Sequence, residues 1–174
     1  MKDNRVLLGF SGGIDSFAAV GLLQAAGYHV TALTLDMRGD SALLEKARLR
    51  AGTLGIPWRM RSVRERFERE VVDYFTDSYF RGRTPAPCTR CNSRIKWPCL
   101  AAEADALGIR HIATGHYFCI TSAGGKRYVT RAADNRKDQS YYLWDLPQEI
   151  LDRVLTPMGT VIKRNIVEGL ADRR

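Results

Sequence analysis

The sequence predicts an α/β fold built on a doubly wound parallel sheet. Short apolar runs rich in β-forming residues alternate with segments of helical length, a pattern typical of β-α-β units. Gly27, Gly55 and Gly108 stand directly after three predicted helices, where glycine commonly ends a helix. At 174 residues the chain has the length of one domain, so we expect residues 1–174 to fold as a single unit.

The first five elements follow from local patterns. In order, they are a strand at 5–8, a helix at 14–26, a strand at 29–37, a helix at 41–54 and a short strand at 56–61. Asp15 or Ser16 is expected to cap the first helix and Ser41 the second, because short polar side chains satisfy the free N–H groups of a first turn. The third strand is predicted despite Pro57 at its start.

The second half mixes helices with one strand and a hairpin. The predicted elements are an amphipathic helix at 63–79, a loop at 81–92, a helix at 93–107, a strand at 110–114, a hairpin at 118–121 and 126–131, partly helical stretches at 141–146 and 147–154, and a last helix at 165–171. A glycine and two prolines place the loop. Pro98 is expected to shift the start of its helix or to kink it, and Gly124-Gly125 predicts the hairpin turn.

The chain is organised around V-L-L-G-F-S-G-G-I-D-S, residues 6–16. A strand, a glycine-rich turn and a helix N-terminus present backbone N–H groups and the positive end of a helix dipole to an anion. The string lacks the Gly-Lys-Ser/Thr of a Walker loop and the G-x-G-x-x-G of dinucleotide folds. It resembles instead the loop of the PP-loop ATP pyrophosphatases, which implies ATP. An ordinary glycine-rich turn with a capping serine is the alternative.

Donors for a pyrophosphate are available in this loop from Ser11, Gly12, Gly13 and Ser16, and Asp15 is suited to hold Mg²⁺ against it. In the resembling proteins the end of the second strand lies against adenine, which here means near Leu35. Residues 115–117 follow the fourth predicted strand. Because ligands of such sheets bind beyond the carboxyl ends of the strands, these three segments predict one nucleotide site.

Composition restricts the function classes. Charged residues make up 26% of the chain and hydrophobic residues 45%, as in ordinary soluble domains. No apolar run is long enough to span a bilayer and no signal-peptide pattern is present, so we expect a cytoplasmic protein without a membrane partner. A net charge of +8 and a pI of about 9.6 suit a polyanionic partner. A basic surface that serves only solubility is the alternative.

Cys88 and Cys91 form a C-x-x-C pair in the predicted loop. Paired thiols can ligate zinc or an iron–sulfur cluster, but both need further ligands, and Cys99 and Cys119 fall in a predicted helix and strand. A redox pair of thioredoxin type is a poor match for this loop. As a nucleophile, Cys91 would stand at a helix N-terminus among arginines and have a lowered thiol pKa. These arginines are Arg83, Arg90 and Arg94. Thiols beside a nucleotide site suggest sulfur transfer.

Four motifs, in order along nearly the whole chain, resemble those of the tRNA-specific 2-thiouridylases of the MnmA type. G-F-S-G-G-I-D-S is similar to their G-M-S-G-G-V-D-S, and T-P-A-P-C-T-R-C-N-S-R-I-K-W to their T-P-N-P-(C/D)-x-x-C-N-x-x-I-K-F. A-T-G-H-Y is similar to their A-T-G-H-Y, and R-K-D-Q-S-Y-Y-L to their N-K-D-Q-S-Y-F-L. The resemblance implies an enzyme that adenylates the wobble uridine of tRNA with ATP and replaces its 2-oxygen by sulfur from a cysteine persulfide.

The resemblance also implies roles for single residues. ATP would contact Gly9, Phe10, Ser11, Gly12, Gly13, Ile14, Asp15, Ser16 and Gly115, with Leu35 near the adenine. Cys91, which precedes an Asn, would be the catalytic nucleophile. The target base would lie by Ala86, Pro87 and Cys88, and tRNA would contact Lys137, Asp138 and Gln139. His116 is expected to orient the Gly115 loop rather than to act as an acid or base. A separate protein would donate the persulfide sulfur.

Two departures from the family pattern leave alternatives open. Ala86 replaces the usual Asn, which weakens an expected base contact. The family continues into a second catalytic cysteine, a central domain and a β-barrel, whereas this sequence ends at Arg174. We expect a fragment, a separate chain that supplies the missing domains, or different chemistry. In the last case Cys88 would resolve a persulfide on Cys91, or both thiols would hold an iron–sulfur cluster.

Two other functions fit the same fold. One is a PP-loop enzyme that adenylates, or inserts sulfur into, another substrate; the other is a nucleotide- or tRNA-binding module that is inactive alone. The basic charge and the K-D-Q-S string favour tRNA over a small substrate. The intact S-G-G-I-D-S and C-x-x-C strings argue against a loss of activity.

Overall fold

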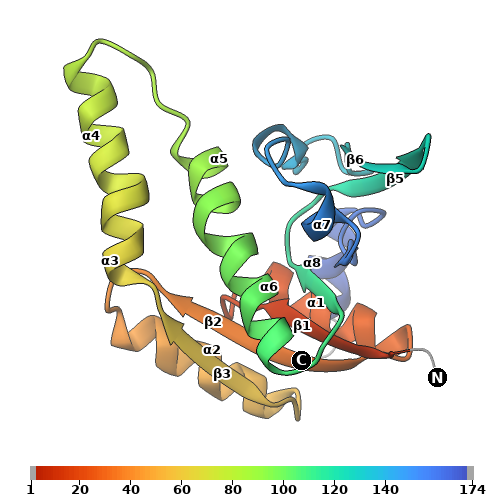
Figure 1. The fold of residues 1–174 in the computed structure, drawn as a ribbon. Helices are drawn as coiled ribbons and strands as arrows, with labels where there is room; N and C mark the ends of the chain where they lie inside the picture. The colour runs from red at the N-terminus through yellow and green to blue at the C-terminus, as the bar shows by residue number, and fades with distance from the viewer. Residues whose placement is uncertain (1–2, 172–174) are drawn as a thin grey trace.

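The computed structural model describes residues 3–171 and confirms the predicted fold class. Its centre is a parallel sheet of five strands in the order β3-β2-β1-β4-β7. These strands are β1 (Arg5–Gly9), β2 (His29–Asp36), β3 (Trp58–Ser62), β4 (His111–Thr114) and β7 (Val154–Leu155). A separate antiparallel hairpin consists of β5 (Cys119–Ala123) and β6 (Lys126–Thr130), as Figure 1 shows.

Helices cover both faces of the central sheet (Figure 1). The helices of this core are α1 (Ile14–Ala25), α2 (Ser41–Thr53) and α6 (Trp97–Ala106). Side chains alternate along β1, so Val6 and Leu8 pack with α1 and α2, while Leu7 packs with α6. All three are fully buried, and each such side chain contributes about 1.5–3 kcal/mol to stability. The continuous apolar run of β1 is explained by this burial on both faces.

The direction of the strand order changes at β1. This strand has β2 on one side and β4 on the other, so successive connections lead toward opposite edges of the sheet. In sheets of this kind a crevice opens at the carboxyl ends of the two strands that flank such a point. The fold therefore places a candidate site between the ends of β1 and β4.

Two helical stretches stand side by side and project beyond the sheet (Figure 1); together we call them the helical arm. The first runs from α3 (Arg64–Phe67) through the π-helical turn η1 (Glu68–Val72) to α4 (Asp73–Phe80), close to the prediction. The second runs from α5 (Pro87–Cys91) through the π-helical turn η2 (Asn92–Lys96) to α6. Arg90 joins the stretches, because its guanidinium donates to Glu70 and lies 4.5 Å from the centre of the Tyr74 ring.

The second stretch of the arm begins earlier than predicted. A loop was expected at 81–92, but the helix starts at Pro87. Proline suits the first helical position, since its missing N–H would have no partner there. Cys88 and Cys91 therefore lie inside the first turns of a helix, and Cys91 does not directly precede it.

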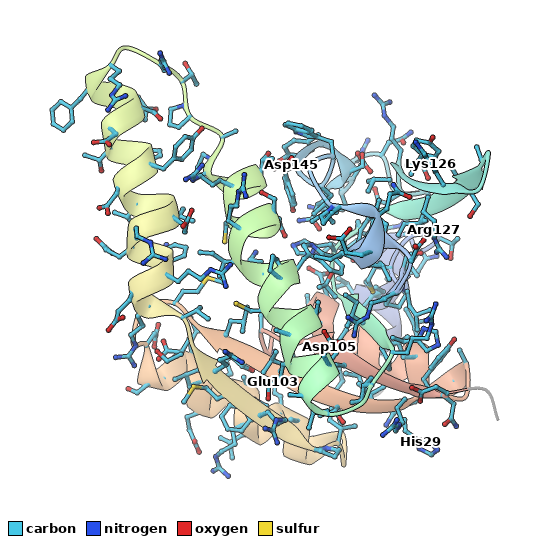
Figure 2. The ribbon with its side chains drawn as sticks, in the orientation of Figure 1. His29, Glu103, Asp105, Lys126, Arg127 and Asp145 are labelled. Atoms are coloured by element: carbon cyan, nitrogen blue, oxygen red, sulfur yellow. The ribbon has the colours of Figure 1, made fainter. Side chains whose placement is uncertain are left out.

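Pro98 lies within this helix and does not end it. Trp97 N–H bonds to Asn92 O, five residues back, and this wider turn directly precedes the proline. Local π-type turns of this kind relieve the clash between a proline ring and the preceding helical turn. Further along, the largely buried Glu103 accepts from Arg59 Nε at 2.9 Å and Arg61 Nη1 at 3.1 Å, which holds the helix on β3 (Figure 2).

Three smaller predictions were wrong. Val154, expected in a partly helical stretch, belongs to β7 and pairs with Ile112 of β4. Helix α2 is capped by Asp40, whose carboxylate accepts Leu43 N–H at 3.0 Å, and not by Ser41. Helix α1 has Gly13 at its N-cap, so no side chain of the loop caps it.

Short elements complete the fold. They are the 3₁₀ turn η3 (Ser140–Tyr142), α7 (Gln148–Leu151) and α8 (Lys163–Ala171). Within residues 3–171, no helix is both long enough and apolar enough to cross a membrane.

Candidate functional site

A pocket of about 300 Å³ opens at the carboxyl ends of β1 and β4. Its walls come from the loop after β1, the end of β2, the helical arm and the segment after β4. The lining residues are Gly9, Phe10, Ser11, Asp15, Ser16, Leu33, Thr34, Leu35, Met37, Lys96, Leu100, Thr114, Gly115, His116 and Gln139. The three predicted segments thus meet in one place, whereas ATP binding by these residues stays a prediction. Gly12, Gly13 and Ile14 shape the loop without lining the pocket.

The loop before α1 is fixed by close backbone packing. Gly12 has a φ of +67°, and a Cβ there would lie 2.9 Å from Ala47 Cα in α2, so only glycine fits without moving that helix. Ser11 Oγ accepts Gly13 N–H at 3.2 Å, and Ser16 Oγ donates to Gly13 O at 3.0 Å. The serines of S-G-G-I-D-S therefore brace the loop from within.

Gly115 brings the end of β4 against the first turn of α1. A Cβ at this position would lie 2.8 Å from Ser16 N and 3.0 Å from Ser16 Cα, closer than any side chain tolerates. Because Gly13 supplies no capping side chain, the first N–H groups of α1 remain available to a ligand. Together these features form a backbone cradle suited to an anion.

Asp15, the predicted Mg²⁺ ligand, has both carboxylate oxygens engaged. The Tyr117 hydroxyl donates to Oδ1 at 2.8 Å, and Lys163 Nζ donates to Oδ2 at 2.8 Å. Burial, together with the hydrogen bond to this carboxylate, raises the pKa of Tyr117. A metal ion would have to displace the Lys163 ammonium before it could bind these oxygens. The arrangement therefore does not fit Mg²⁺ at Asp15.

The end of β2 offers a backbone edge to the pocket. Phe10 N–H donates to Leu33 O at 2.8 Å, and beyond it the Thr34 side chain donates to Phe10 O at 2.7 Å. Backbone groups alternate in direction along a strand, so Leu35 directs its N–H and C=O to the same side as Leu33, where β1 has already ended. Free backbone N–H and C=O groups of this kind can form hydrogen bonds with a purine ring, as predicted for Leu35.

His116 lies in the pocket wall as a neutral imidazole. Its Nδ1 is 2.8 Å from Thr114 Oγ1. Burial, followed by the nearby charge of Lys96, lowers the pKa of His116 to about 3. The ring lies 6.4 Å from Trp97 and 5.9 Å from Tyr142, between ring centres. At neutral pH it holds no second proton to donate, which agrees with the orienting role expected for it.

The two candidate thiols have different surroundings. Cys88 is exposed, whereas Cys91 is buried in an apolar cluster. The other buried members of this Cys91 cluster are Val63, Val71, Ile95 and Cys99. Leu35 and Met37 pack against the cluster and also line the pocket. The Cys91 thiol therefore lies behind a wall that it shares with the candidate nucleotide site.

The pKa of the Cys91 thiol is raised, contrary to the prediction. Burial outweighs the charge of Lys96, which acts in the opposite direction. Of the three arginines expected to lower this pKa, Arg83 and Arg94 are exposed, and Arg90 is engaged by Glu70 as described above. The sequence reveals which charges are nearby along the chain, but not that the thiol turns into the core.

The first turn of α5 carries the residues predicted beside the target base. Ala86 and Cys88 are exposed, and Pro87 is partly buried. Asn92 Nδ2 donates to Cys88 O at 2.9 Å, while its buried Oδ1 has no hydrogen-bond partner within the described residues. This turn is therefore the accessible surface next to the buried Cys91.

The three predicted tRNA-contact residues have three different environments. Both carboxylate oxygens of Asp138 accept hydrogen bonds from its own loop, at 2.8 and 2.7 Å. Gln139 lines the pocket, and its Oε1 accepts Tyr117 N–H at 3.0 Å. Lys137 is exposed. Only Lys137 thus has its charged group directed outward, while Asp138 shapes the loop that presents it.

The described side chains form no cluster that is suited to bind a metal ion. In the part of the chain that the structure describes, no three His, Cys, Asp or Glu residues gather closely enough to bind a metal ion. Cys99 is buried in the Cys91 cluster, and Cys119 lies in β5 against Gly159. Residues 3–171 therefore supply no further ligand for an iron–sulfur cluster at Cys88 and Cys91.

Sequence reasoning missed two lysines of the site. Lys96 lines the pocket beside His116, and Lys163 reaches Asp15 from α8, 148 positions along the chain. Lys96 belongs to the I-K-W string quoted above. Its position in a predicted helix near the strand ends could have identified it as a pocket residue. Lys163 had no such signal, because only the tertiary fold brings α8 to the loop.

The chain matches one family model and is similar in sequence to curated proteins. Residues 4–174 match the family model described as the tRNA methyl transferase HUP domain. The chain is 46% identical to tRNA-specific 2-thiouridylase MnmA 2 of Phocaeicola vulgatus, over 99% of this chain and 50% of the relative. It is 48% identical to tRNA-specific 2-thiouridylase MnmA 1 of Bacteroides fragilis strain YCH46, over 93% of this chain and 45% of the relative. The chain thus spans about half the length of these curated relatives.

Solved structures share the fold at much lower identity. One is the predicted subunit of tRNA methyltransferase from Methanocaldococcus jannaschii, with a TM-score of 0.59 and 16% identity over 96% of this chain and 74% of that chain. Another is the NH3-dependent NAD synthetase from Campylobacter jejuni, with a TM-score of 0.57 and 19% identity over 99% of this chain and 65% of that chain. At these identities the likeness concerns the fold alone.

Proposed function

The chain belongs to the tRNA methyl transferase HUP domain family, and on this premise we propose that it is the nucleotide-binding part of an ATP-dependent tRNA sulfurtransferase that makes 2-thiouridine. The observation that carries the proposal is the wall of Leu35 and Met37, which has the pocket on one side and the Cys91 cluster on the other. An activating nucleotide and a thiol can then act on one substrate. The 2-thiouridylase names of the relatives support uridine in tRNA as that substrate.

We assign the pocket to ATP. The adenine would lie against the backbone of Leu35, and the phosphates would lie on the first turn of α1, between the loop at 11–13 and Gly115. There the uridine O2 would attack the α-phosphorus and pyrophosphate would leave. The C2 oxygen, a poor leaving group by itself, would then depart as AMP.

Mg²⁺ has no ligand assigned here, and no step is derived through it. Asp15 is held by Tyr117 and Lys163, so its role in this proposal is to fix these two residues at the mouth of the pocket. The Lys163 ammonium, paired with Asp15, adds positive charge beside the cradle.

The sulfur step uses both thiols of α5. The terminal sulfur of a persulfide on Cys91 would attack C2, and AMP would leave, so that a C–S bond replaces the C–O bond. The Cys88 thiolate would then attack the inner sulfur on Cys91. That attack breaks the S–S bond, leaves the sulfur on the uridine and forms a Cys88–Cys91 disulfide, which a thiol reductant returns to two thiols. If Cys88→Ser keeps full sulfur transfer, Cys88 has no part in this step.

Partners outside these residues belong to the proposal. A separate persulfide-carrying protein would load Cys91, and the tRNA would lie over Ala86, Pro87, Cys88 and the loop of Lys137. Because the chain spans about half the length of its relatives, we propose that further sequence or a second chain completes the grip on tRNA. The cytoplasm is the compartment that this substrate suggests.

Pyrophosphate release is the first test. Purified protein is given ATP and unmodified tRNA, with and without a persulfide source, and the tRNA nucleosides are analysed. We expect pyrophosphate release that depends on tRNA. We also expect wild type to form 2-thiouridine and Cys91→Ser to form none. Release that depends on a small acceptor and not on tRNA would overturn the choice of substrate. ATP binding without any release would instead indicate a binding module.

A further inference from the structure

Two of the most exposed aromatic side chains of the molecule follow the predicted tRNA-contact loop directly. Tyr141 is 71% exposed and Trp144 is 72% exposed. They are three positions apart: Tyr141 lies in the 3₁₀ turn, and Trp144 lies two residues beyond its end. We call this pair the aromatic platform. Apolar surface that is exposed in one continuous patch often marks a binding site.

The platform stands on a rigid base. The side chains of Tyr142, Leu143 and Leu146, which alternate with it along the chain, are buried in the core under α6. On the N-terminal side, Gln139 is tied to Tyr117 through its backbone N–H at 2.8 Å and through its Oε1. The backbone that carries the two exposed rings is therefore held in place before any ligand arrives, which lowers the entropic cost of binding.

A chain of aromatic contacts leads from the platform to the pocket. Tyr141 lies 4.7 Å from Tyr142 between ring centres, and Tyr142 lies 5.9 Å from His116, which lines the pocket. The exposed thiol is also near, because the charge of Cys88 is among the causes that raise the pKa of Tyr142, after burial and Tyr141. The platform thus borders both parts of the proposed active site.

The loop that precedes the platform carries unpaired positive charge, whereas Asp145, directly after Trp144, is an exposed carboxylate. Arg136 and Lys137 are exposed, and among the described residues neither forms an ion pair. The two acidic side chains of this loop are already used: Asp134 accepts backbone N–H groups from Arg136 and Lys163, and Asp138 is bound within the loop. Exposed rings beside free cations suit a single-stranded nucleic acid, whose bases stack while its phosphates are neutralised.

We propose that Tyr141 and Trp144 stack the unpaired bases next to the modified uridine, and so hold single-stranded RNA across the thiol and nucleotide sites. The inference rests on the proposed function and names its RNA subsite. Stacking is tolerant of sequence because every base has a π face. The platform would therefore fix the position of the loop nucleotides while the reacting uridine enters between Cys88 and the pocket.

Fluorescence and RNA binding test the platform together. Trp97 is fully buried and Trp58 is partly buried with its indole N–H bonded to Thr34, so among the tryptophans of this chain Trp144 is the one that acrylamide reaches. The probe is a seven-nucleotide RNA loop with a central uridine. We expect this RNA to quench and protect Trp144. We expect Tyr141→Ala and Trp144→Ala each to weaken RNA binding by about 5- to 100-fold, the range of one lost base stack.

Conservative and matched variants separate stacking from damage to the fold. Tyr141→Phe and Trp144→Phe keep an aromatic face and should bind within about twofold of wild type, since stacking needs only the ring. Leu49→Ala removes an apolar side chain that is 57% exposed on α2, which packs on the face of the sheet opposite the base of the platform, and should leave binding unchanged. Replacing single flanking bases with abasic sites should abolish the difference between wild type and Trp144→Ala at the stacked position.

Several outcomes would overturn the inference. If wild type binds the RNA and both alanine variants bind equally well, the platform is no RNA subsite, while the proposed function stands. If acrylamide cannot reach Trp144 before RNA is added, protein and not RNA covers this surface. If wild type neither binds the RNA nor releases pyrophosphate with tRNA, the proposed function fails together with the inference.

Discussion

The candidate nucleotide pocket is shaped by backbone contacts, whereas the helical arm with the thiols is shaped by side-chain packing. In the pocket, Gly12 and Gly115 let main-chain segments meet so closely that no Cβ fits. In the arm, Cys91 lies in a small apolar cluster, and the outer end of α4 leaves Tyr79 and Phe80 60% and 87% exposed. The described walls of the pocket are therefore fixed by contacts within this chain, while the arm presents surface for a partner. Nucleotide binding should depend on this chain alone, and sulfur transfer on what docks there.

The largest expected effect comes from adding a side chain at Gly115. Gly115→Val would press against Ser16 N and Cα, where even a Cβ lies at 2.8 Å, and moving α1 would open the cradle. We expect a loss of at least about 3 kcal/mol in ATP binding or in stability, at the upper end of overpacking effects. Isothermal titration with ATP, together with thermal unfolding, measures both.

Gly21→Ala is the matched control, since a Cβ there meets nothing within 4 Å on the exposed side of the same helix α1. It should bind ATP normally and gain up to about 1 kcal/mol in stability, the difference between alanine and glycine in a helix. Normal ATP binding by Gly115→Val would show that the pocket is not shaped by backbone contact.

Acid should weaken the pocket side of the molecule through His116. Because its pKa falls from 6.5 to about 3 on folding, the unfolded chain binds the proton first, and stability is lost as pH drops below about 6.5. At pH 5 the loss should be about 2 kcal/mol, from about 1.4 kcal/mol per pH unit.

Urea unfolding of wild type and His116→Gln between pH 7 and pH 5 measures this loss. The variant lacks the titrating group, so its stability should change little over that range. An equal slope in both proteins would place the acid sensitivity in a group other than His116.

The two thiols of the arm should differ in their rate of alkylation. Cys88 is exposed and Cys91 is buried with a raised pKa, and the reactive species is the thiolate. At pH 7.5 we expect iodoacetamide to modify Cys88 much faster than Cys91, because burial both shields the Cys91 thiol and disfavours its thiolate. Mass spectrometry of Cys88→Ser and Cys91→Ser gives each rate by itself. Equal rates would mean that the Cys91 cluster opens readily in solution.

The smallest effect is expected at Lys163. Lys163→Met leaves the Asp15 carboxylate without its ammonium beside the cradle, so ATP binding should weaken by about fivefold and stability by up to about 1 kcal/mol, as for partly exposed ion pairs. Lys163→Arg keeps the charge and should bind ATP nearly as wild type. If added Mg²⁺ restored ATP binding to Lys163→Met fully, Asp15 would be a metal ligand once it is released from the lysine.

Sequence by itself determined the parts of this protein that depend on neighbouring residues. Each strand of the sheet except β7 was predicted, because a short apolar run and a terminal glycine act locally. The position of S-G-G-I-D-S after β1, and its meeting with the Leu35 region and Gly115, followed from the rule for strand ends in doubly wound sheets. The cap of α2 and the start of α5 were misplaced by a few residues, since neighbouring candidates such as Asp40 and Ser41 differ little in propensity.

Tertiary structure alone decided the contacts that cross the chain. The two-residue strand β7 exists because β4 is there to pair with it. Cys91 has a raised pKa because packing against Leu35 and Met37 removes it from water, although the arginines around it in sequence predicted the reverse. Lys163 reaches Asp15 across 148 positions. Burial and long-range ion pairs depend on how elements pack in space, and local sequence does not carry that information.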